Sequence, residues 1–158
     1  MIETTLALPL TDQPCPQVLL ALKKRGFGKG KITGVGGKIE AGESVAQAAA
    51  RELAEEIAIT VQLTDLRPAG VIDFLFPFKP GWNMRSHLFV VQRWQGMPTE
   101  SEEVAPAFYP FSQLPFEQMW ADARHWLPPI LAGQTIQARF VFAEDNETLS
   151  EVFVRLVS

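Results

Sequence analysis

The chain has 158 residues, 47% of them apolar and 20% charged, which is the length and composition of one compact globular domain spanning residues 1–158. Its 14 lysine and arginine residues against 18 aspartate and glutamate residues give a net charge of −4, which disfavours a nucleic-acid polymer as a partner. The single cysteine, Cys15, excludes an intramolecular disulfide, and no apolar run reaches the roughly 18 to 20 residues of a membrane helix, so we expect a soluble, cytoplasmic monomer without a membrane partner.

The first residues of the chain predict a hairpin and a loop. Residues 4–10 and 18–22 have the composition of short strands, and the turn-forming residues 11–16 between them make a hairpin the simplest connection. Residues 23–31 then mix three glycines with five cations. This composition is typical of a loop rather than of a regular element.

A helix is predicted over residues 44–57. Ser44 followed by Gln47 is a capping-box signature, which marks the start of a helix. Five alanines lie among Leu53, Ile57 and charged residues in this stretch, and alanine has the highest helix propensity.

Strands dominate the middle of the chain. Residues 69–78, 84–93 and 107–111 are rich in aromatic and branched side chains, and Pro-Gly and Gly-Met-Pro turns separate them. We therefore expect three further strands.

The end of the chain predicts a second helix and a closing hairpin. The helix is expected at residues 126–131, where Pro128 and Pro129 restrict its starting point. Residues 134–142 and 148–157 alternate apolar and polar side chains around a polar turn. The whole pattern predicts an α/β (α+β) fold, a mixed β-sheet with helices packed against it.

Three glutamates share one face of the first predicted helix. At about 100° per residue, Glu52, Glu55 and Glu56 lie within an arc of about 100°, and Leu53 and Ile57 occupy the adjoining face. Clustered carboxylates repel one another unless a cation neutralises them, and a hard divalent cation is the usual one. The pattern predicts an apolar face toward the sheet and an anionic face that binds Mg²⁺, with Mn²⁺ as an alternative.

Neighbouring residues fit such a site. Arg51 precedes Glu55 by one helical turn and can orient a carboxylate on the same face, while Gly36, Gly37 and Gly42 permit tight turns and a close approach of the backbone to phosphates. Most glutamate-rich helices, however, carry ordinary surface salt bridges. Arg51 and the three glutamates alone therefore do not establish a site.

The spacing of these residues resembles the Nudix box, in which a glycine is followed at fixed distances by a glutamate, by Arg-Glu-Leu and by Glu-Glu. The matching residues are Gly37, Glu43, Arg51, Glu52, Leu53, Glu55, Glu56 and Ile59. Ala58 stands where the family usually has a glycine, which would relieve a left-handed or crowded turn, so alanine costs about 1 kcal/mol there without touching the chemistry. The resemblance implies the Nudix fold, a mixed β-sheet sandwiched between α-helices, and hydrolysis of a nucleoside diphosphate linked to another moiety.

Outside the box, most of the chain resembles the MutT-homologue oxidised purine nucleoside triphosphatases, or 8-oxo-dGTP diphosphatases. The resemblance is carried by residues 18–20, 23–28 and 36–38 and by Gly34, Phe74, Phe76, Met84, Glu100, Ser101, Glu103, Met119, Trp120, Asp122 and Trp126. It implies a Mg²⁺-dependent hydrolase that converts an oxidised purine (deoxy)nucleoside triphosphate, such as 8-oxo-dGTP or 2-hydroxy-dATP, into the monophosphate and pyrophosphate. Such a reaction would sanitise the nucleotide pool and support DNA repair.

Carried onto this chain, the resemblance implies a set of metal ligands and a catalytic group. The metal ligands are the Gly36 carbonyl, Glu52, Glu55, Glu56 and Glu103. The catalytic residues are Glu56, Glu52 and Arg51. Spacing does not decide the general base among Glu52, Glu56 and Glu103, and Glu56 is our choice.

The resemblance also implies a substrate pocket. Its residues are Thr5, Lys23, Phe27, Thr33, Gly37, Lys38, Phe74, Met84, Trp120, Asp122 and Trp126. Aromatic faces would stack on a purine, although single aromatic residues more often belong simply to the core. Asp122, if enclosed by Trp120 and Trp126, would have a raised pKa and could donate a hydrogen bond to an oxo group.

Two departures leave the substrate open. The family has an asparagine where this chain has Thr33 and a second aspartate where it has Ala123, so hydrogen bonds to the base are lost. An alternative substrate is therefore another modified nucleotide, either a methylated purine triphosphate or a nucleotide sugar. A non-catalytic module that binds a modified base is a third hypothesis, but such modules typically lack the metal-binding glutamates, which this chain has.

Overall fold

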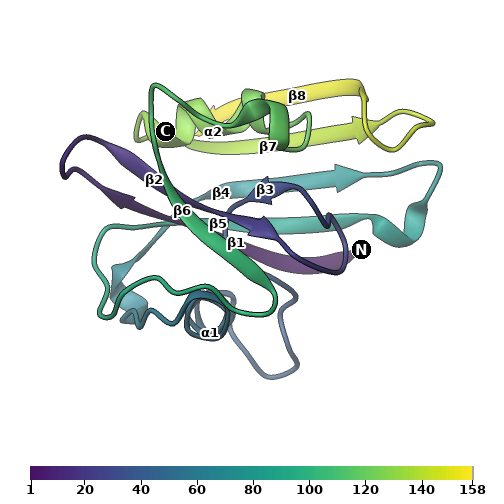
Figure 1. Cartoon of the computed structure of the whole chain (residues 1–158). Coiled ribbons are helices and arrows are strands. Elements are labelled where there is room, and N and C mark those ends of the chain that lie inside the picture. Colours follow the sequence, from purple (N-terminus) through teal and green to yellow (C-terminus); the bar gives the residue numbers. More distant parts are fainter. Residues whose placement is uncertain (158) are drawn as a thin grey trace.

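The computed structural model describes residues 1–157, and in it a mixed sheet lies between the helices α1 and α2 (Figure 1). The strands are β1 (Ile2–Thr11), β2 (Gln17–Lys23), β3 (Ile32–Thr33), β4 (Leu66–Leu75), β5 (Met84–Val91), β6 (Val104–Pro110), β7 (Thr135–Phe142) and β8 (Leu149–Val157). The helices are α1 (Val45–Ile57) and α2 (Ala123–Leu131), with short 3₁₀ helices at Leu63–Asp65, Pro80–Trp82 and Phe116–Gln118. The predicted fold class is confirmed.

Strand β1 joins the two halves of the sheet. The strand order is β3-β2-β1-β5-β4-β7-β8, with β6 paired to β2 outside this path. Strand β1 runs parallel to β5 over its length and β4 runs parallel to β7, while the other pairs are antiparallel. The two predicted hairpins, β1–β2 and β7–β8, are both present.

The first helix starts and ends as the sequence predicts. The Gln47 N–H donates to Ser44 Oγ at 3.1 Å and the Ser44 N–H donates to Gln47 Oε1 at 2.8 Å, which completes the capping box. After the last turn, Ala58 adopts φ 61° and ψ 29°. This left-handed conformation is the one that a glycine relieves, as expected from its place in the motif.

The second helix is longer than predicted. It begins at Ala123 rather than at residue 126 and continues through Pro128 and Pro129. Its buried side chains Ala123, Trp126, Leu127 and Ile130 recur at the spacing of one helical face. Burial of this face against the sheet outweighs the backbone hydrogen bonds that the prolines remove.

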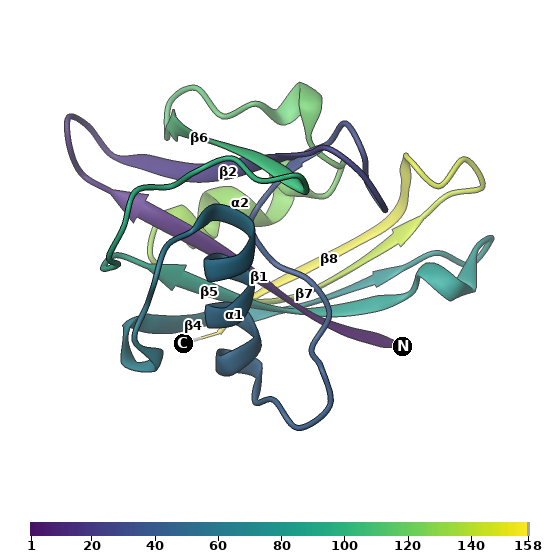
Figure 2. The same ribbon diagram turned by 60° about the horizontal axis from the view of Figure 1, so that its bottom comes forward.

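Each face of the sheet is covered by one helix. One apolar cluster contains Trp126, Leu127 and Ile130 of α2, and the other contains Leu53 and Ile57 of α1. Figure 2 shows α1 lying across the strands of its face. Within residues 1–157, no helix combines the length and the apolar character that a membrane crossing requires.

The strand boundaries differ from the prediction where local structure intervenes. Strand β4 starts at Leu66 and ends at Leu75 instead of covering residues 69–78, because the side chain of Asn83 accepts the Phe76 N–H at 2.6 Å and the chain turns there. Strands β5 and β6 end and begin at Val91 and Val104 rather than at residues 93 and 107. The two-residue strand β3 was not predicted, because so short a segment has no periodicity.

Candidate active site

A cavity of about 420 Å³ brings most of the predicted site residues together. Its lining contains the following predicted residues: Thr5, Lys23, Phe27, Thr33, Gly36, Gly37, Lys38, Glu56, Phe74, Met84, Trp120, Asp122 and Trp126. Four predicted residues are not part of this lining: Arg51, Glu52, Glu55 and Glu103. The cavity therefore runs from an aromatic end, near the start of α2, to a charged end beside α1.

Asp122 is the buried acid of the aromatic end. It precedes α2 and is 3% exposed, and its Oδ2 accepts the Trp126 indole N–H at 2.7 Å. Its Oδ1 is buried without a partner. Burial raises the pKa of Asp122 from 3.8 to about 6, although the hydrogen bond from Trp126 opposes the rise. A neutral Asp122 therefore carries its proton on Oδ1, because Oδ2 already accepts a hydrogen bond.

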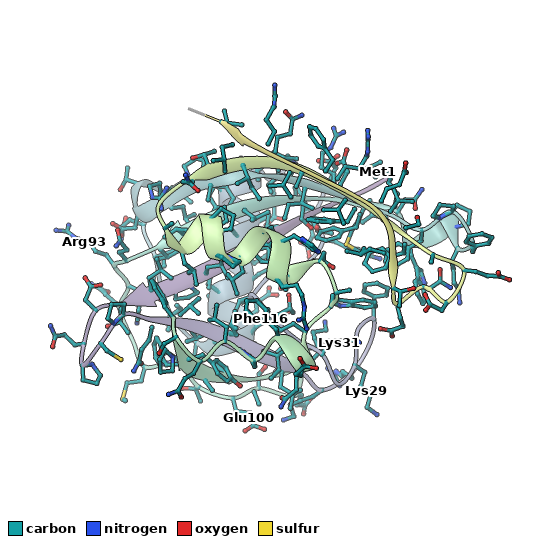
Figure 3. The ribbon with its side chains drawn as sticks, turned by 90° about the horizontal axis from the view of Figure 1, so that it is seen from above. Met1, Lys29, Lys31, Arg93, Glu100 and Phe116 are labelled. Atoms are coloured by element: carbon teal, nitrogen blue, oxygen red, sulfur yellow. The ribbon has the colours of Figure 1, made fainter. Side chains whose placement is uncertain are left out.

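Flat aromatic surfaces enclose the same end. The rings of Phe27 and Trp120 stack with 5.5 Å between centroids, and Trp82 meets Phe27 edge-on at 4.9 Å. Lys31 places its ammonium 5.0 Å from the Trp120 ring and pairs with Glu147 at 2.8 Å. Figure 3, which looks onto α2, labels Lys31 on the loop after β2. Through these contacts Trp120 packs into the wall of the cavity.

At the charged end, Glu52 and Glu56 are two neighbouring buried carboxyls. They are 9% and 8% exposed. Burial raises the pKa of Glu56, and the charge of Glu52 and a hydrogen bond with it raise the pKa further. A Cβ on Gly37 would lie 2.6 Å from Glu52 Oε1, so any other residue there would force the Glu52 carboxyl to move. An acid pair with so little water around it needs a shared proton or a cation beside it, and Arg51 supplies a cation to Glu52 but none of its hydrogen bonds goes to Glu56.

Arg51 ties the helix to the loop before it. Its guanidinium donates to Glu43 at 2.6 and 3.0 Å, to Glu52 at 2.9 Å and to Glu55 at 3.2 Å. It also donates to the Lys38 carbonyl at 3.0 Å. The pKa of Glu43 is lowered, above all by its hydrogen bond from Arg51. The sequence predicted an orienting role toward the helical face, but it did not predict that Glu43 is a main partner.

Glu103 lies near the charged end but is held elsewhere. It precedes β6, whose pairing with β2 places Val104 opposite Lys23. Its carboxylate accepts from Arg25 Nε at 2.8 Å, and this hydrogen bond lowers the pKa of Glu103. Among residues 1–157, no three His, Cys, Asp or Glu side chains are gathered in a way that would hold a metal ion. The structure thus pairs Glu52 with Glu56, while Arg51 holds Glu52 and Glu55 and Arg25 holds Glu103.

The glycine segment, residues 36–37, lies directly against β1. The Thr5 N–H donates to the Gly37 carbonyl at 2.9 Å, and a Cβ on Gly36 would lie 1.8 Å from the Thr5 carbonyl oxygen. The Thr5 hydroxyl is buried in the cavity lining without a partner. The absence of a side chain at Gly36 therefore sets how close this segment can approach β1.

Some lining residues were not predicted, among them Thr4, Phe76, Trp82, Ser86 and Phe142. Thr4 and Ser86 share a hydrogen bond of 2.6 Å. In the sequence, each of them is a polar residue at an inward-facing strand position. Only the pairing of β1 with β5 shows that the two lie side by side. The two residues that depart from the family pattern lie in different places. Thr33 lines the cavity, whereas Ala123 is buried in the apolar cluster under α2.

Comparisons with known proteins identify the family. The profile of the NUDIX domain family matches residues 3–129. The chain is 39% identical to the "Oxidized purine nucleoside triphosphate hydrolase" of Mus musculus over 146 residues, which are 92% of this chain and 90% of that protein. It is 42% identical to the protein of the same name from Danio rerio over 137 residues, 87% of this chain and 85% of that one.

Solved structures agree on the fold. The crystal structure of a Mutator MutT protein from Bacillus halodurans superposes with a TM-score of 0.80 at 23% sequence identity, and the match covers 98% of this chain and 97% of that one. Family profile, relatives and fold lead to one conclusion: the chain belongs to the Nudix family.

Proposed function

We propose that this protein is a Mg²⁺-dependent diphosphatase that hydrolyses an oxidised purine (deoxy)nucleoside triphosphate to the monophosphate and pyrophosphate. The observation that carries the proposal is the continuity of one cavity from the Trp120 and Asp122 end to Glu56. A base held between aromatic rings at one end would extend its phosphates toward the carboxyls at the other. The names of the mouse and zebrafish relatives support the same substrate class.

The charged end fits a divalent cation, which Nudix hydrolases generally use. Glu52 and Glu56 are buried side by side, and a cation would relieve both the burial and the mutual repulsion that raise the pKa of Glu56. We assign the metal to these two carboxylates and the Gly36 carbonyl, with Glu55 and Glu103 reaching it after leaving their arginine partners. When bound, Mg²⁺ would neutralise the phosphate charge beside the scissile bond.

The residues of the chain divide the remaining work. Ionised Glu56 accepts a proton from the attacking water. The water oxygen bonds to one of the two phosphorus atoms that the α–β bridging oxygen joins, and that oxygen leaves with the other phosphate group. Lys23 and Lys38 line the cavity and stabilise the developing negative charge. Arg51 holds the Glu52 carboxylate at 2.9 Å, so we assign it a positioning role.

At the aromatic end, Trp120 would stack on the purine and Asp122 would read its edge. A neutral Asp122 donates from Oδ1, whose burial without a partner leaves it available to an oxo group of the base. This pairing favours an oxidised purine, because oxidation adds an oxygen acceptor to the ring. We propose sanitation of the nucleotide pool as the biological role.

A second substrate class is favoured by one observation. Thr33 lines the cavity with a single hydroxyl, so it offers fewer hydrogen bonds than an amide would. Another modified nucleotide, such as a methylated purine triphosphate or a nucleotide sugar, is therefore the alternative substrate. The intact set of carboxylates argues against a module that only binds.

The test is Mg²⁺-dependent pyrophosphate release from a panel of 8-oxo-dGTP, 2-hydroxy-dATP, methylated purine triphosphates, unmodified dNTPs and ADP-ribose. We expect kcat/KM to be higher for an oxidised purine by about tenfold or more, which corresponds to one or two hydrogen bonds to the base. Preference for another member of the panel would select the alternative substrate class. No hydrolysis of any member would overturn the proposal.

A further inference from the structure

Two buried hydroxyls line the cavity without a part in the function proposed above. They belong to Thr4 of β1 and Ser86 of β5, which lie opposite each other in the parallel pairing of these strands. Thr4 is 8% exposed and Ser86 is 4% exposed. Their oxygens are 2.6 Å apart, so they form one hydrogen-bonded unit at the wall of the cavity.

The pair interrupts an apolar face of the sheet. Side chains alternate along a strand, so Thr4 shares its face with Leu6 and Leu8, and Ser86 shares its face with Leu88 and Val90. These four apolar residues belong to or pack against the cluster that contains α2, which is the side where Asp122 lies. Hydrocarbon side chains would fill these two positions without polar atoms to satisfy, so packing alone does not account for the hydroxyls.

Counting protons gives the pair a polarity. Each hydroxyl has one proton to donate. The 2.6 Å contact can be donated by either hydroxyl, and the Arg85 carbonyl, 3.3 Å from Thr4 Oγ1, is an acceptor that Thr4 can use when Ser86 donates to it. In that arrangement Ser86 Oγ has donated its only proton and keeps its lone pairs free. The chain from Ser86 through Thr4 to the carbonyl therefore presents a hydrogen-bond acceptor at the cavity.

We propose that Ser86 Oγ, backed by Thr4, accepts a hydrogen bond from the exocyclic amino group of the substrate purine and so determines base specificity. This inference rests on the proposed function for the orientation of the ligand. With the phosphates at Glu56 and Lys38, the sugar-distal ring of the purine, which carries the amino group, lies deepest in the cavity. Ser86 is a deeply buried residue of that cavity, and an amino group is a donor that matches its free lone pairs.

Together with Asp122, the pair gives the apolar end a matched set of groups. Asp122 Oδ1 has no partner and, when it carries the proton, supplies a donor, while Ser86 supplies an acceptor. A base with an oxo group and an amino group satisfies both. A base that lacks the amino group leaves Ser86 desolvated and unpaired, which is the situation that discriminates most strongly in a dry pocket.

The experiment compares Ser86→Ala with wild type on two substrates that differ only in the amino group, 8-oxo-dGTP and 8-oxo-dITP. For the wild type we expect kcat/KM to favour the amino substrate by about fivefold or more, the worth of one neutral hydrogen bond. The variant should lose this preference through a higher KM for 8-oxo-dGTP, with kcat nearly unchanged and 8-oxo-dITP unaffected. An equal preference in variant and wild type would overturn the inference.

Two further variants separate recognition from structure. Ser150→Ala is the matched control, because Ser150 on β8 donates to the Val141 carbonyl at 3.2 Å and is not part of the cavity lining. It should leave the preference intact. Thr4→Val keeps the side-chain shape but removes the acceptor of the Ser86 proton, so the preference should shrink. If Ser86→Ala lowers the melting temperature and leaves the preference unchanged, the pair is structural and the inference fails.

Binding measurements make the inference independent of turnover. Trp82, Trp120 and Trp126 line the cavity, so their fluorescence reports binding of the product nucleotides 8-oxo-dGMP and 8-oxo-dIMP. If the protein binds 8-oxo-dGMP more tightly than 8-oxo-dIMP but hydrolyses neither triphosphate, the proposed function is wrong and the inference about Ser86 stands. A protein that hydrolyses both triphosphates equally keeps the function and loses the inference.

Discussion

The two ends of the cavity each hold a buried acid, and they differ in what raises its pKa. For Asp122 the cause is burial alone, and the hydrogen bond from Trp126 works against it. For Glu56, burial acts together with the charge of Glu52. An arriving cation would relieve the second situation, whereas protonation relieves the first. We therefore expect the carboxyl group to act as a neutral hydrogen-bond donor at one end of the cavity and as a charged metal ligand at the other.

The strongest way to break this comparison is Glu56→Gln, which keeps the shape of the side chain and removes its charge. We expect kcat to fall by about 10² to 10⁴, the usual contribution of a general base, while nucleotide binding persists. Pyrophosphate release and monophosphate binding measure the two effects. Glu117→Gln, at a side chain that is 92% exposed, is the control. Unchanged turnover would remove Glu56 from the mechanism.

The next largest effect is expected at the other end, from the pH dependence of stability. The folded protein holds the pKa of Asp122 at about 6 instead of 3.8, so it binds the proton more tightly than the unfolded chain does. Stability from this group is present below the unfolded value and is lost as pH rises through the folded one. At about 1.4 kcal/mol for each pH unit, the loss amounts to roughly 3 kcal/mol.

Asp122→Asn tests this directly, because an amide oxygen still accepts the Trp126 N–H but does not titrate. Relative to this variant, the unfolding free energy of the wild type should fall by roughly 3 kcal/mol between about pH 3 and about pH 7.5. Denaturant unfolding at several pH values measures the difference. Parallel pH profiles for the two proteins would mean that burial does not control the protonation of Asp122.

A smaller effect sharpens the comparison at the charged end. Arg51→Met leaves the buried Glu52 without its arginine partner, and we expect a loss of about 2 kcal/mol in unfolding free energy because Glu52 is only 9% exposed. Arg25→Met removes the partner of Glu103, where both side chains are about half exposed, and the loss should be clearly smaller because water screens this pair. Equal losses would show that burial does not strengthen the Arg51 network.

The smallest expected effect has the opposite sign. Ala58 caps the end of α1, the helix that carries the glutamates. Its φ of 61° is a left-handed conformation in which a residue with a Cβ is strained. Ala58→Gly should raise the unfolding free energy by about 0.5 kcal/mol, because the relieved strain exceeds the entropy that glycine adds to the unfolded chain. Thermal unfolding checks this, and kcat should stay unchanged. A lower melting temperature would contradict the expectation.

Local signals explain what could be predicted from the sequence. The capping box at Ser44 and Gln47 fixed the start of α1, and the left-handed turn at Ala58 fixed its end, since both depend only on neighbouring residues. The paired hairpins likewise follow from alternation and turns. The start of α2 was misplaced because the prolines suggested a boundary that the burial of Ala123 overrides.

Contacts between distant segments explain the rest. Glu43 as a partner of Arg51, and Arg25 as a partner of Glu103, depend on side chains meeting across loops. Thr4 and Ser86 are separated by 82 positions, and only the register of β1 on β5 brings them together. Residues 23–31 suggested a loop, but nothing in their composition indicated that Phe27 stacks on Trp120.

The close approach of the glycine segment to β1 has a genetic consequence. At Gly36 a Cβ would lie 1.8 Å from the Thr5 carbonyl oxygen, whereas at Gly81, also in the cavity lining, it would meet nothing within 4 Å. Every missense codon at position 36 therefore displaces a strand, while many at position 81 change only the rim. In a library randomised at both positions and selected for activity, we expect only glycine codons at position 36 and many different codons at position 81. We therefore expect substitutions that change the cavity to be tolerated at Gly81 and not at Gly36.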